Sequence, residues 1–377
     1  MKAENRSVAT VDSVIASLVH HYTTVVLPIW RDVGFNVETQ LPFEAVDPVV
    51  HQPLPVSRYR AMACARQLFV FSRAGELDHA AKLFESLVHN FHDVTRGGWY
   101  FSVGPDLVPL DTTKDLYTHA FVIFACSEYL MRSGAPQAER VLRDTVELIE
   151  ARFPAHAQGG LLNGALDRNF EQVVTSPIQN PIMHLAEAYL AAKAATGDGS
   201  FDEALRRIAR MMESTFLDSK TGCILELPCG TEANRIEPGH QFEWFYLVQS
   251  GSLGWAGERL SESMNRAFEF AQRHGIDSAT KGVRAALNLD ASVQDATERI
   301  WAQTEYLRAL ALQEGGAQSH MLVEQIPAVS SKFLSQRGWI ECLADDGRTV
   351  RSDMPSTTPY HLCTAYAELQ NLVSSPR

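Results

Sequence analysis

Residues 220–227 read KTGCILEL, in which a glycine separates a polar turn from a short run of mostly apolar residues. Comparable stretches recur at DVGFNV (32–37), RGGWYFSV (96–103), QGGLLNGAL (158–166), TKGVRAAL (280–287) and QRGWIECL (336–343). Their glycines, at positions 34, 98, 160, 222, 282 and 338, lie 56 to 64 residues apart. We expect each glycine to cap the helix before it and to open a small hairpin. Each interval has room for two helices and their connections, so the sequence predicts six helix pairs.

Apolar residues three and four positions apart support these helices. The clearest stretches are ARQLFVFSRAG (65–75), LYTHAFVIFACSEYL (116–130), MHLAEAYLAA (183–192), FDEALRRIARMMESTF (201–216), TEYLRALAL (304–312) and TAYAELQNLV (364–373). Six pairs can stack as an open solenoid or close as an (α/α)6 barrel. The second helix of each pair is the more apolar one, and its first turn collects polar and aromatic residues. Closure explains both facts, because the second helices then form an inner ring whose first turns meet at one mouth.

No Pro/Gly/Ser-rich linker or low-complexity segment interrupts the repeat. We therefore predict a single domain over residues 1–377. Its fold class is all-α, an (α/α)6 barrel with short β-hairpins in the connecting loops.

Composition limits the partners of this chain. The 377 residues are 45% hydrophobic and carry a net charge of −12 without any Lys/Arg run, which argues against nucleic acid and anionic membranes. No stretch approaches about 20 uninterrupted apolar residues, and no secretory leader pattern opens the chain, so we expect a cytoplasmic protein. The six cysteines are scattered, and the nearest pair lacks the spacing of a zinc site. We expect a small, weakly charged ligand, and a homodimer stays open.

Unusual polar and aromatic residues recur at similar distances after the repeated glycines. If the ring closes, these residues converge on one pocket of the size of a small sugar. The candidates near the starts of the second helices are Arg60, Arg66, Tyr117, His184, His240, Trp301, Glu305 and His361. A structural role competes with ligand binding for Tyr117, and a role in the core competes with sugar stacking for Trp301.

Helical spacing adds further candidates, because residues three or four apart share a helix face. Asn180, His184 and Glu187 form one such stripe. In RIEPGHQFEW (235–244), Glu243 shares a face with His240. Pro181 and Pro238 stand where a first helical turn tolerates proline.

Six ordered segments together resemble the N-acylglucosamine 2-epimerase superfamily, which includes mannose isomerases and cellobiose 2-epimerases. They are ARQLFVFSRA, KDLYTHAFVIF, QNPIMHLAEAYL, RIEPGHQFEWFYL, RIWAQTEYLRAL and TPYHLCTAY, and they span nearly the whole chain. The resemblance implies an (α/α)6 barrel that acts on a reducing sugar without a redox cofactor. It implies that His240 and His361 are the acid/base pair. The residues that match other functional positions of the family are Arg66, His184, Glu187, Glu243, Trp301 and Glu305.

The implied chemistry suits these residues. Moving a proton at C1 or C2 of an open-chain sugar passes through an enediol(ate), and histidine titrates near neutrality. The oxyanion that develops needs hydrogen-bond donors, for which Arg66 and His184 are candidates. The PGH-Q-F-E-W form resembles mannose isomerases, which favours conversion of D-mannose to D-fructose. One departure is Ile182, where relatives often carry a second histidine.

Four other classes of function stay open. N-acyl-D-glucosamine 2-epimerisation is the main alternative, and cellobiose 2-epimerisation is another. A glycoside hydrolase on the same barrel needs two carboxylates roughly 5–9.5 Å apart, which Glu243 and Glu305 could supply. A helical-repeat binding protein would instead spread its unusual residues over an extended face. We predict no metal, because the His-x-x-Glu order is the reverse of the di-iron Glu-x-x-His motif and paired thiols are absent.

Overall fold

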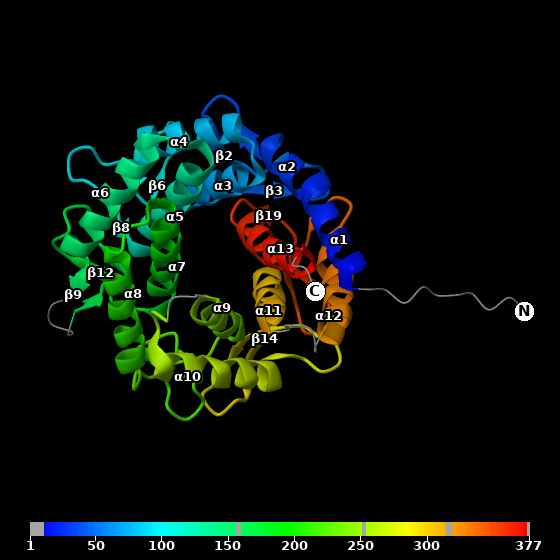
Figure 1. Ribbon diagram of the computed structural model, residues 1–377. Helices are drawn as coiled ribbons and strands as arrows, with labels where there is room; N and C mark the ends of the chain where they lie inside the picture. The colour runs from blue at the N-terminus through cyan, green and yellow to red at the C-terminus, as the bar shows by residue number, and fades with distance from the viewer. Residues whose placement is uncertain (1–10, 156–159, 251–253, 314–318, 375–377) are drawn as a thin grey trace, which may run out of the picture.

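Helices alternate between an outer and an inner ring in the computed structural model, which describes residues 11–155, 160–250, 254–313 and 319–374 (Figure 1). The outer ring contains α1 (Val11–His21), α2 (Leu27–Arg31), α4 (Leu77–Phe91), α6 (Pro136–Arg152), α8 (Ser200–Met211), α10 (Gly257–Phe270) and α12 (Ser319–Phe333). The π-helical segments η1 (Tyr22–Val26), η3 (Met212–Phe216) and η4 (Ala271–Gly275) extend α1, α8 and α10. The inner ring contains α3 (Ala61–Ala74), α5 (Leu116–Ser133), α7 (Gln179–Thr196), α9 (Pro238–Gln249), α11 (Ile300–Gln313) and α13 (Thr358–Ser374).

The inner ring is closed. Each inner helix packs against the next one along the chain, and α13 returns to pack against α3. Strand β19 (Met354–Pro355) pairs with β3 (Ala45–Asp47) across the same junction, with Met354 opposite Val46. The predicted (α/α)6 barrel is therefore confirmed, and an open solenoid is wrong.

The inner and outer helices differ in how much of their surface is buried, and their sequences match this difference. In the inner helix α9, every residue from Pro238 to Val248 is buried. In the outer helix α8, the buried residues Phe201, Leu205 and Ile208 lie on one face, and charged residues cover the other. A helix that is apolar or buried all round must lie inside the protein, whereas an amphipathic helix can face water.

The repeated glycines follow the outer helices, but they do not all cap them as predicted. The N–H of Gly34 donates to the carbonyl of Ile29 in the last turn of α2, as in a C-cap, whereas Gly338 is the first residue of β16. Gly222 has φ +80°, and its N–H donates to the carbonyl of Asp218. In the equivalent turn, Lys281 rather than Gly282 takes the left-handed conformation, with φ +60°. The left-handed glycines that do cap helices follow three inner helices instead: Gly75, Gly134 and Gly197.

Small antiparallel sheets connect the pairs. Two-stranded ones contain β1 (Phe35–Asn36) with β2 (Leu41–Pro42), β9 (Pro154–Ala155) with β10 (Leu161–Leu162), and β15 (Leu334–Ser335) with β16 (Gly338–Trp339). Larger ones contain β3 and β19 with β4 (Gln52–Pro53); β5 (Tyr59–Arg60), β6 (Ser102–Val103) and β7 (Pro109–Asp111); and β8 (Lys114–Asp115), β11 (Ala165–Leu166) and β12 (Val173–Thr175). The four-stranded one contains β13 (Arg284–Leu287), β14 (Val293–Arg299), β17 (Cys342–Leu343) and β18 (Thr349–Arg351). Because β5, β8 and β14 lead directly into α3, α5 and α11, they fix where those helices begin.

The segment Val11–Arg31, formed by α1, η1 and α2, is long and apolar enough by length and composition to cross a membrane. In the barrel, its side chains Ile15, Leu18 and Val26 are buried, and α1 packs against α12 and α13. This packing accounts for the apolar character of the segment. The cytoplasmic location stays a prediction.

Candidate active site

A polar cavity of about 390 Å³ opens among the first turns of the inner helices. Both predicted catalytic histidines line it, together with six of the nine other predicted site residues. Its lining consists of Arg66, Tyr117, Ile178, Asn180, His184, Glu226, Leu227, Arg235, Glu237, His240, Glu243, Arg299, Trp301 and His361. Residues that are far apart in the sequence thus meet in one hollow, as ring closure requires.

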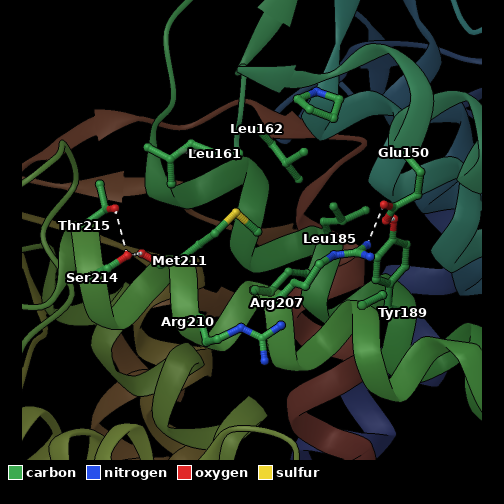
Figure 2. A pocket seen from close by; sticks show the side chains of 14 residues that line it. Glu150, Leu161, Leu162, Leu185, Tyr189, Arg207, Arg210, Met211, Ser214 and Thr215 are labelled. Carbon is green, nitrogen blue, oxygen red and sulfur yellow. Dashed lines mark hydrogen bonds and ion pairs between the residues drawn. The ribbon is translucent and has the colours of Figure 1, made fainter. Parts of the chain in front are cut away.

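A larger cavity of about 560 Å³ lies between α6, α7, α8 and η3, away from these histidines (Figure 2). Its polar groups are largely paired with one another, since Tyr189 and Arg207 both donate to the carboxylate of Glu150. Much of the remaining lining is apolar. The smaller cavity is therefore the candidate active site.

His240 is held by a carboxylate that the sequence analysis did not single out. Its Nδ1 lies 2.7 Å from Oε1 of Glu226, and Oε2 of Glu237 lies 3.6 Å away. Gln179 donates to Glu226 through Nε2 and accepts from Trp244 through Oε1. Burial alone would lower the pKa of His240, but Glu226 and Glu237 raise this pKa to about 9. The imidazole is therefore protonated at neutral pH.

His361 also has a carboxylate partner, but its pKa is shifted in the opposite direction. Its Nδ1 lies 2.8 Å from Oε1 of Glu305, whose Oε2 accepts from Nη1 of Arg308 at 3.3 Å. Burial lowers the pKa of His361, and Glu305 offsets only part of this effect. The pKa of Glu305 is also lowered, because Arg308 and His361 outweigh its burial. In both histidines the carboxylate occupies Nδ1, which leaves Nε2 as the nitrogen that can reach a ligand.

Trp301 contacts both imidazoles. The ring centroid of its indole lies 5.0 Å from that of His240 and 5.7 Å from that of His361, with interplanar angles of 35° and 38°. The indole fits because residue 239 is glycine: a Cβ there would lie 2.7 Å from Cη2 and Cζ3 of Trp301. The indole of Trp301 thus lies against both imidazoles, and one small ligand can contact all three rings.

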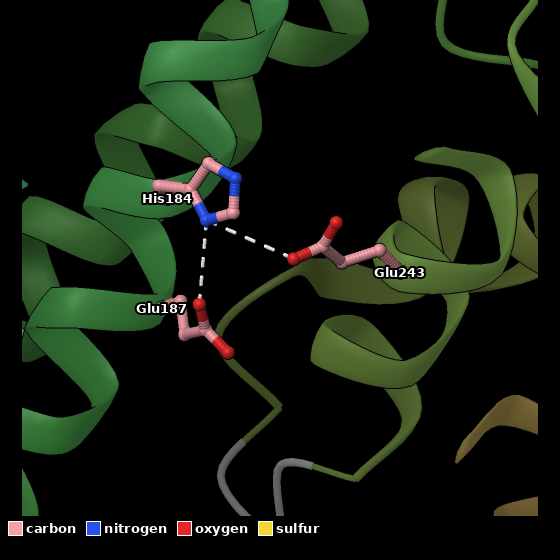
Figure 3. Close-up of side chains that lie close together, drawn as sticks. All are labelled: His184, Glu187 and Glu243. Atoms are coloured by element: carbon pink, nitrogen blue, oxygen red, sulfur yellow. Dashed lines mark hydrogen bonds and ion pairs between the residues drawn. The ribbon is translucent and has the colours of Figure 1, made fainter. Parts of the chain in front are cut away.

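His184, Glu187 and Glu243 form a second polar cluster (Figure 3). Nδ1 of His184 lies 3.4 Å from Oε2 of Glu187 and 3.7 Å from Oε1 of Glu243. Burial lowers the pKa of His184 to about 4, so its ring is neutral at pH 7. Three such groups can ligate a metal, but both oxygens of Glu187 are already engaged, by Nη2 of Arg308 at 3.1 Å and by the hydroxyl of Tyr360.

Arg66 lies among aromatic rings, two of which, Tyr117 and Phe121, also contact His184. Its Nη2 donates to the hydroxyl of Tyr117 at 2.6 Å, and Nη1 donates to the carbonyl of Thr357 at 3.3 Å. Its guanidinium carbon lies 4.1 Å from the ring centroid of Phe121 and 4.8 Å from that of Tyr360. The side chain is thus fixed in place with its charge at the cavity wall.

Three predicted ligand-binding residues do not line the cavity. Glu187 and Glu305 lie behind the histidines that they contact, as described above. Arg60 pairs with Glu44 at 2.6 Å, and this pair lies outside the lining. The structure therefore places Arg60 as a partner of Glu44 rather than at the cavity.

Sequence reasoning also missed several residues that hold the site together. Arg308 follows Glu305 by three positions, so the spacing rule that identified Glu187 could have found it. Tyr360 directly precedes His361. Glu226 gave no signal, because it belongs to a loop and reaches His240 only through the tertiary fold.

The fold agrees with the comparison to known proteins. A toroid of six helix pairs is the architecture of a class of sugar isomerases and epimerases whose solved structures match this chain. The family described as N-acylglucosamine 2-epimerase (GlcNAc 2-epimerase) matches residues 51–365. The chain belongs to this family, and it is a sugar isomerase or epimerase.

Individual relatives differ in their reactions. A Rhizobium meliloti (strain 1021) protein named mannose-6-phosphate isomerase is 30% identical, over 92% of this chain and 94% of the relative. A D-mannose isomerase of Pseudomonas cannabina pv. alisalensis is 29% identical over 46% of this chain and 44% of its own length. The solved cellobiose 2-epimerase of Bacillus thermoamylovorans B4167 superposes with a TM-score of 0.86 at 17% identity, over 96% of this chain and 100% of the other, which shows the shared fold.

Proposed function

We propose that this protein converts D-mannose to D-fructose by proton transfer between C2 and C1, without a redox cofactor. One observation carries the proposal: His240 and His361 face one cavity, each bound at Nδ1 by a buried carboxylate, with pKa values shifted in opposite directions. Groups whose environments separate their pKa values in this way are suited to act as acid and base. The two relatives named D-mannose isomerase support the choice of sugar.

In the proposed mechanism, neutral His361 is the base and protonated His240 is the acid. Nε2 of His361 takes the proton from C2 of the open-chain sugar, while Nε2 of His240 gives a proton to O1, which yields an enediol. His240 then recovers the proton of the O2 hydroxyl as His361 returns its proton to C1, and the ketose forms. Both histidines end in their starting states, so no other reactant is needed. Arg66 supplies donors to the charge that develops on the sugar oxygens.

A phosphorylated sugar is the second candidate substrate. Arg299 lines the cavity directly before α11. Arg235, which also lines the cavity, pairs with Glu237. The guanidinium of Arg299, in contrast, forms no ion pair with any residue that the structure describes. A guanidinium of this kind at the mouth suits a phosphate group. The relative named mannose-6-phosphate isomerase adds weight to this candidate.

Turnover in deuterated water tests both the reaction and the sugar. We would incubate the protein with D-mannose, mannose 6-phosphate, N-acetyl-D-mannosamine and cellobiose, and follow each by proton NMR. The proposal expects fructose, with deuterium at C1 in each molecule for which the imidazolium of His361 exchanges its proton with the solvent before returning it. A product that keeps its aldehyde and carries deuterium at C2 would instead establish an epimerase. Release of a new reducing end from cellobiose would establish a hydrolase, and turnover of the phosphate ester alone would establish the second candidate.

A further inference from the structure

Glu243 is a cavity-lining residue whose carboxylate lacks any hydrogen-bond partner in the described part of the chain. The residue is 0% exposed, and neither Oε1 nor Oε2 makes a hydrogen bond. A buried polar group without such a partner is costly, and an isolated buried anion is far more so. Its presence at the wall of the active site therefore requires an explanation.

The positive charges around Glu243 are too few to neutralise a third buried carboxylate. Glu187, Glu243 and Glu305 are three buried carboxylates around the buried guanidinium of Arg308. The other buried guanidinium at the cavity, that of Arg66, donates to the hydroxyl of Tyr117 and the carbonyl of Thr357 and to none of these carboxylates. Arg308 pairs with Glu187 at 3.1 Å and with Glu305 at 3.3 Å, but no contact joins it to Glu243. Burial is the main cause that raises the pKa of Glu243 far above its ordinary value, and its two carboxylate neighbours raise it further.

The remaining groups that face Glu243 do not change this balance. Beside it on α7 is His184, whose ring is neutral at pH 7 because burial lowers its pKa to about 4. The hydroxyls of Tyr117 on α5 and Tyr360 on α13 stay protonated, since burial raises the pKa of both. His240, on the same helix, brings a positive charge nearby, but it is directly paired with Glu226.

We propose that Glu243 is a neutral carboxylic acid in the resting protein, and that its O–H donates a hydrogen bond to the sugar oxygen on which negative charge develops. A buried neutral acid can donate where a carboxylate can only accept. The proton is shared with the sugar oxygen and is not transferred, so Glu243 starts and ends each cycle protonated. The role at the sugar rests on the proposed function, whereas the protonation of Glu243 does not.

Two other arrangements would explain the same cluster. In the first, the proton lies on Nδ1 of His184, 3.7 Å away, and Glu243 is its anionic partner. In the second, a divalent cation binds between His184, Glu187 and Glu243, whose ligand atoms lie within 4.8 Å of one another. The test must separate both from a neutral acid.

Infrared difference spectroscopy of the wild-type protein against Glu243→Gln reads the protonation state directly, whether or not any sugar is turned over. We expect the wild type at pH 7 to show a protonated-carboxyl C=O band that this variant lacks. Glu232→Gln, at an exposed residue of the loop before α9, is the matched control and should change only ionised-carboxylate bands. Glu341, whose pKa burial raises to about 7, contributes a protonated-carboxyl band to both proteins, and this band cancels in the difference spectrum. A difference spectrum without a protonated-carboxyl band would overturn the proposal.

Activity and metal content complete the test. A glutamine side chain at this position keeps an N–H donor, so we expect Glu243→Gln to retain kcat within about tenfold, whereas Glu243→Leu should lose roughly 10²–10³-fold, as loss of an oxyanion donor does. Equal damage in the two folded variants would refute the donor role. A stoichiometric divalent metal in the wild type that Glu243→Gln loses would establish the cation arrangement instead. If no sugar is turned over, the proposed function fails while the infrared result still decides the charge of Glu243.

Discussion

Substituting Glu226 by glutamine should shift the alkaline limb of the pH–activity profile to lower pH. Glu226 lies 2.7 Å from Nδ1 of His240 and is the largest of the influences that raise the pKa of this histidine to about 9. Without its charge, burial should lower that pKa towards its ordinary value of 6.5, against the remaining influence of Glu237. A full return, by about 2.5 pKa units, corresponds to roughly 3 kcal/mol of stabilisation of the imidazolium, which is the upper limit of the effect.

The sign of the effect follows from the proposed roles. His240 must be protonated to act as the acid, so activity falls as pH rises through its pKa. At pH 8 the protonated fraction should drop by up to about 30-fold in Glu226→Gln, and this loss should largely disappear near pH 6. The acidic limb belongs to His361, whose pKa is lowered, and it should not move. The bell-shaped profile therefore narrows from its alkaline side.

The assay is kcat/KM for D-mannose between pH 5 and 10, since this ratio reports the pKa values of the free protein. Glu232→Gln serves as the control and should reproduce the wild-type profile. If Glu226→Gln keeps the wild-type alkaline limb with only a lower plateau, His240 is not the acid and the reasoning fails.

Three further predictions follow from contacts described above or from buried charges. His361→Asn should lower turnover by about 10²–10⁴-fold and leave the circular dichroism spectrum unchanged, and retained activity would remove His361 from the mechanism. Gly239→Ala should raise KM by displacing the indole of Trp301, and Trp301→Phe in the same chain should recover part of the loss; an unaltered KM in the single variant would contradict the steric argument. Asp93→Asn should cost roughly 3–5 kcal/mol in urea unfolding, because it leaves the fully buried ammonium of Lys114, 3.1 Å away, without its counter-ion; a change within error would show that water reaches that ammonium.

The sequence predicted the barrel because its closure is encoded by a repeat that can be read without any tertiary contact. The same periodicity did not predict which residue of a turn takes the left-handed conformation. At the turn after α10, Lys281 takes the left-handed conformation that the repeat assigned to Gly282, since a hydrogen-bonded turn can impose this conformation on a lysine. A repeat reports the spacing of units, but the conformation of one residue depends on its own turn.

The site was predicted best where a residue acts from the first two turns of an inner helix. His184, His240 and His361 share this location, and the ring brings them together. Glu226 escaped detection because its partnership with His240 joins a loop to a helix start, and no helical periodicity links them. Arg60 was assigned to the site by its distance from Gly34, but spacing along the chain does not determine which way a side chain points.

The contact of α13 with both α3 and α11 has a consequence for biosynthesis. His361 and its partner Glu305 lie on adjacent inner helices, and the strand pairing between Met354 and Val46 joins segments about 300 residues apart. A chain emerging from the ribosome cannot assemble the pair of histidines until residues 358–374 have been translated and docked. The onset of turnover would therefore report the completion of the ring during translation.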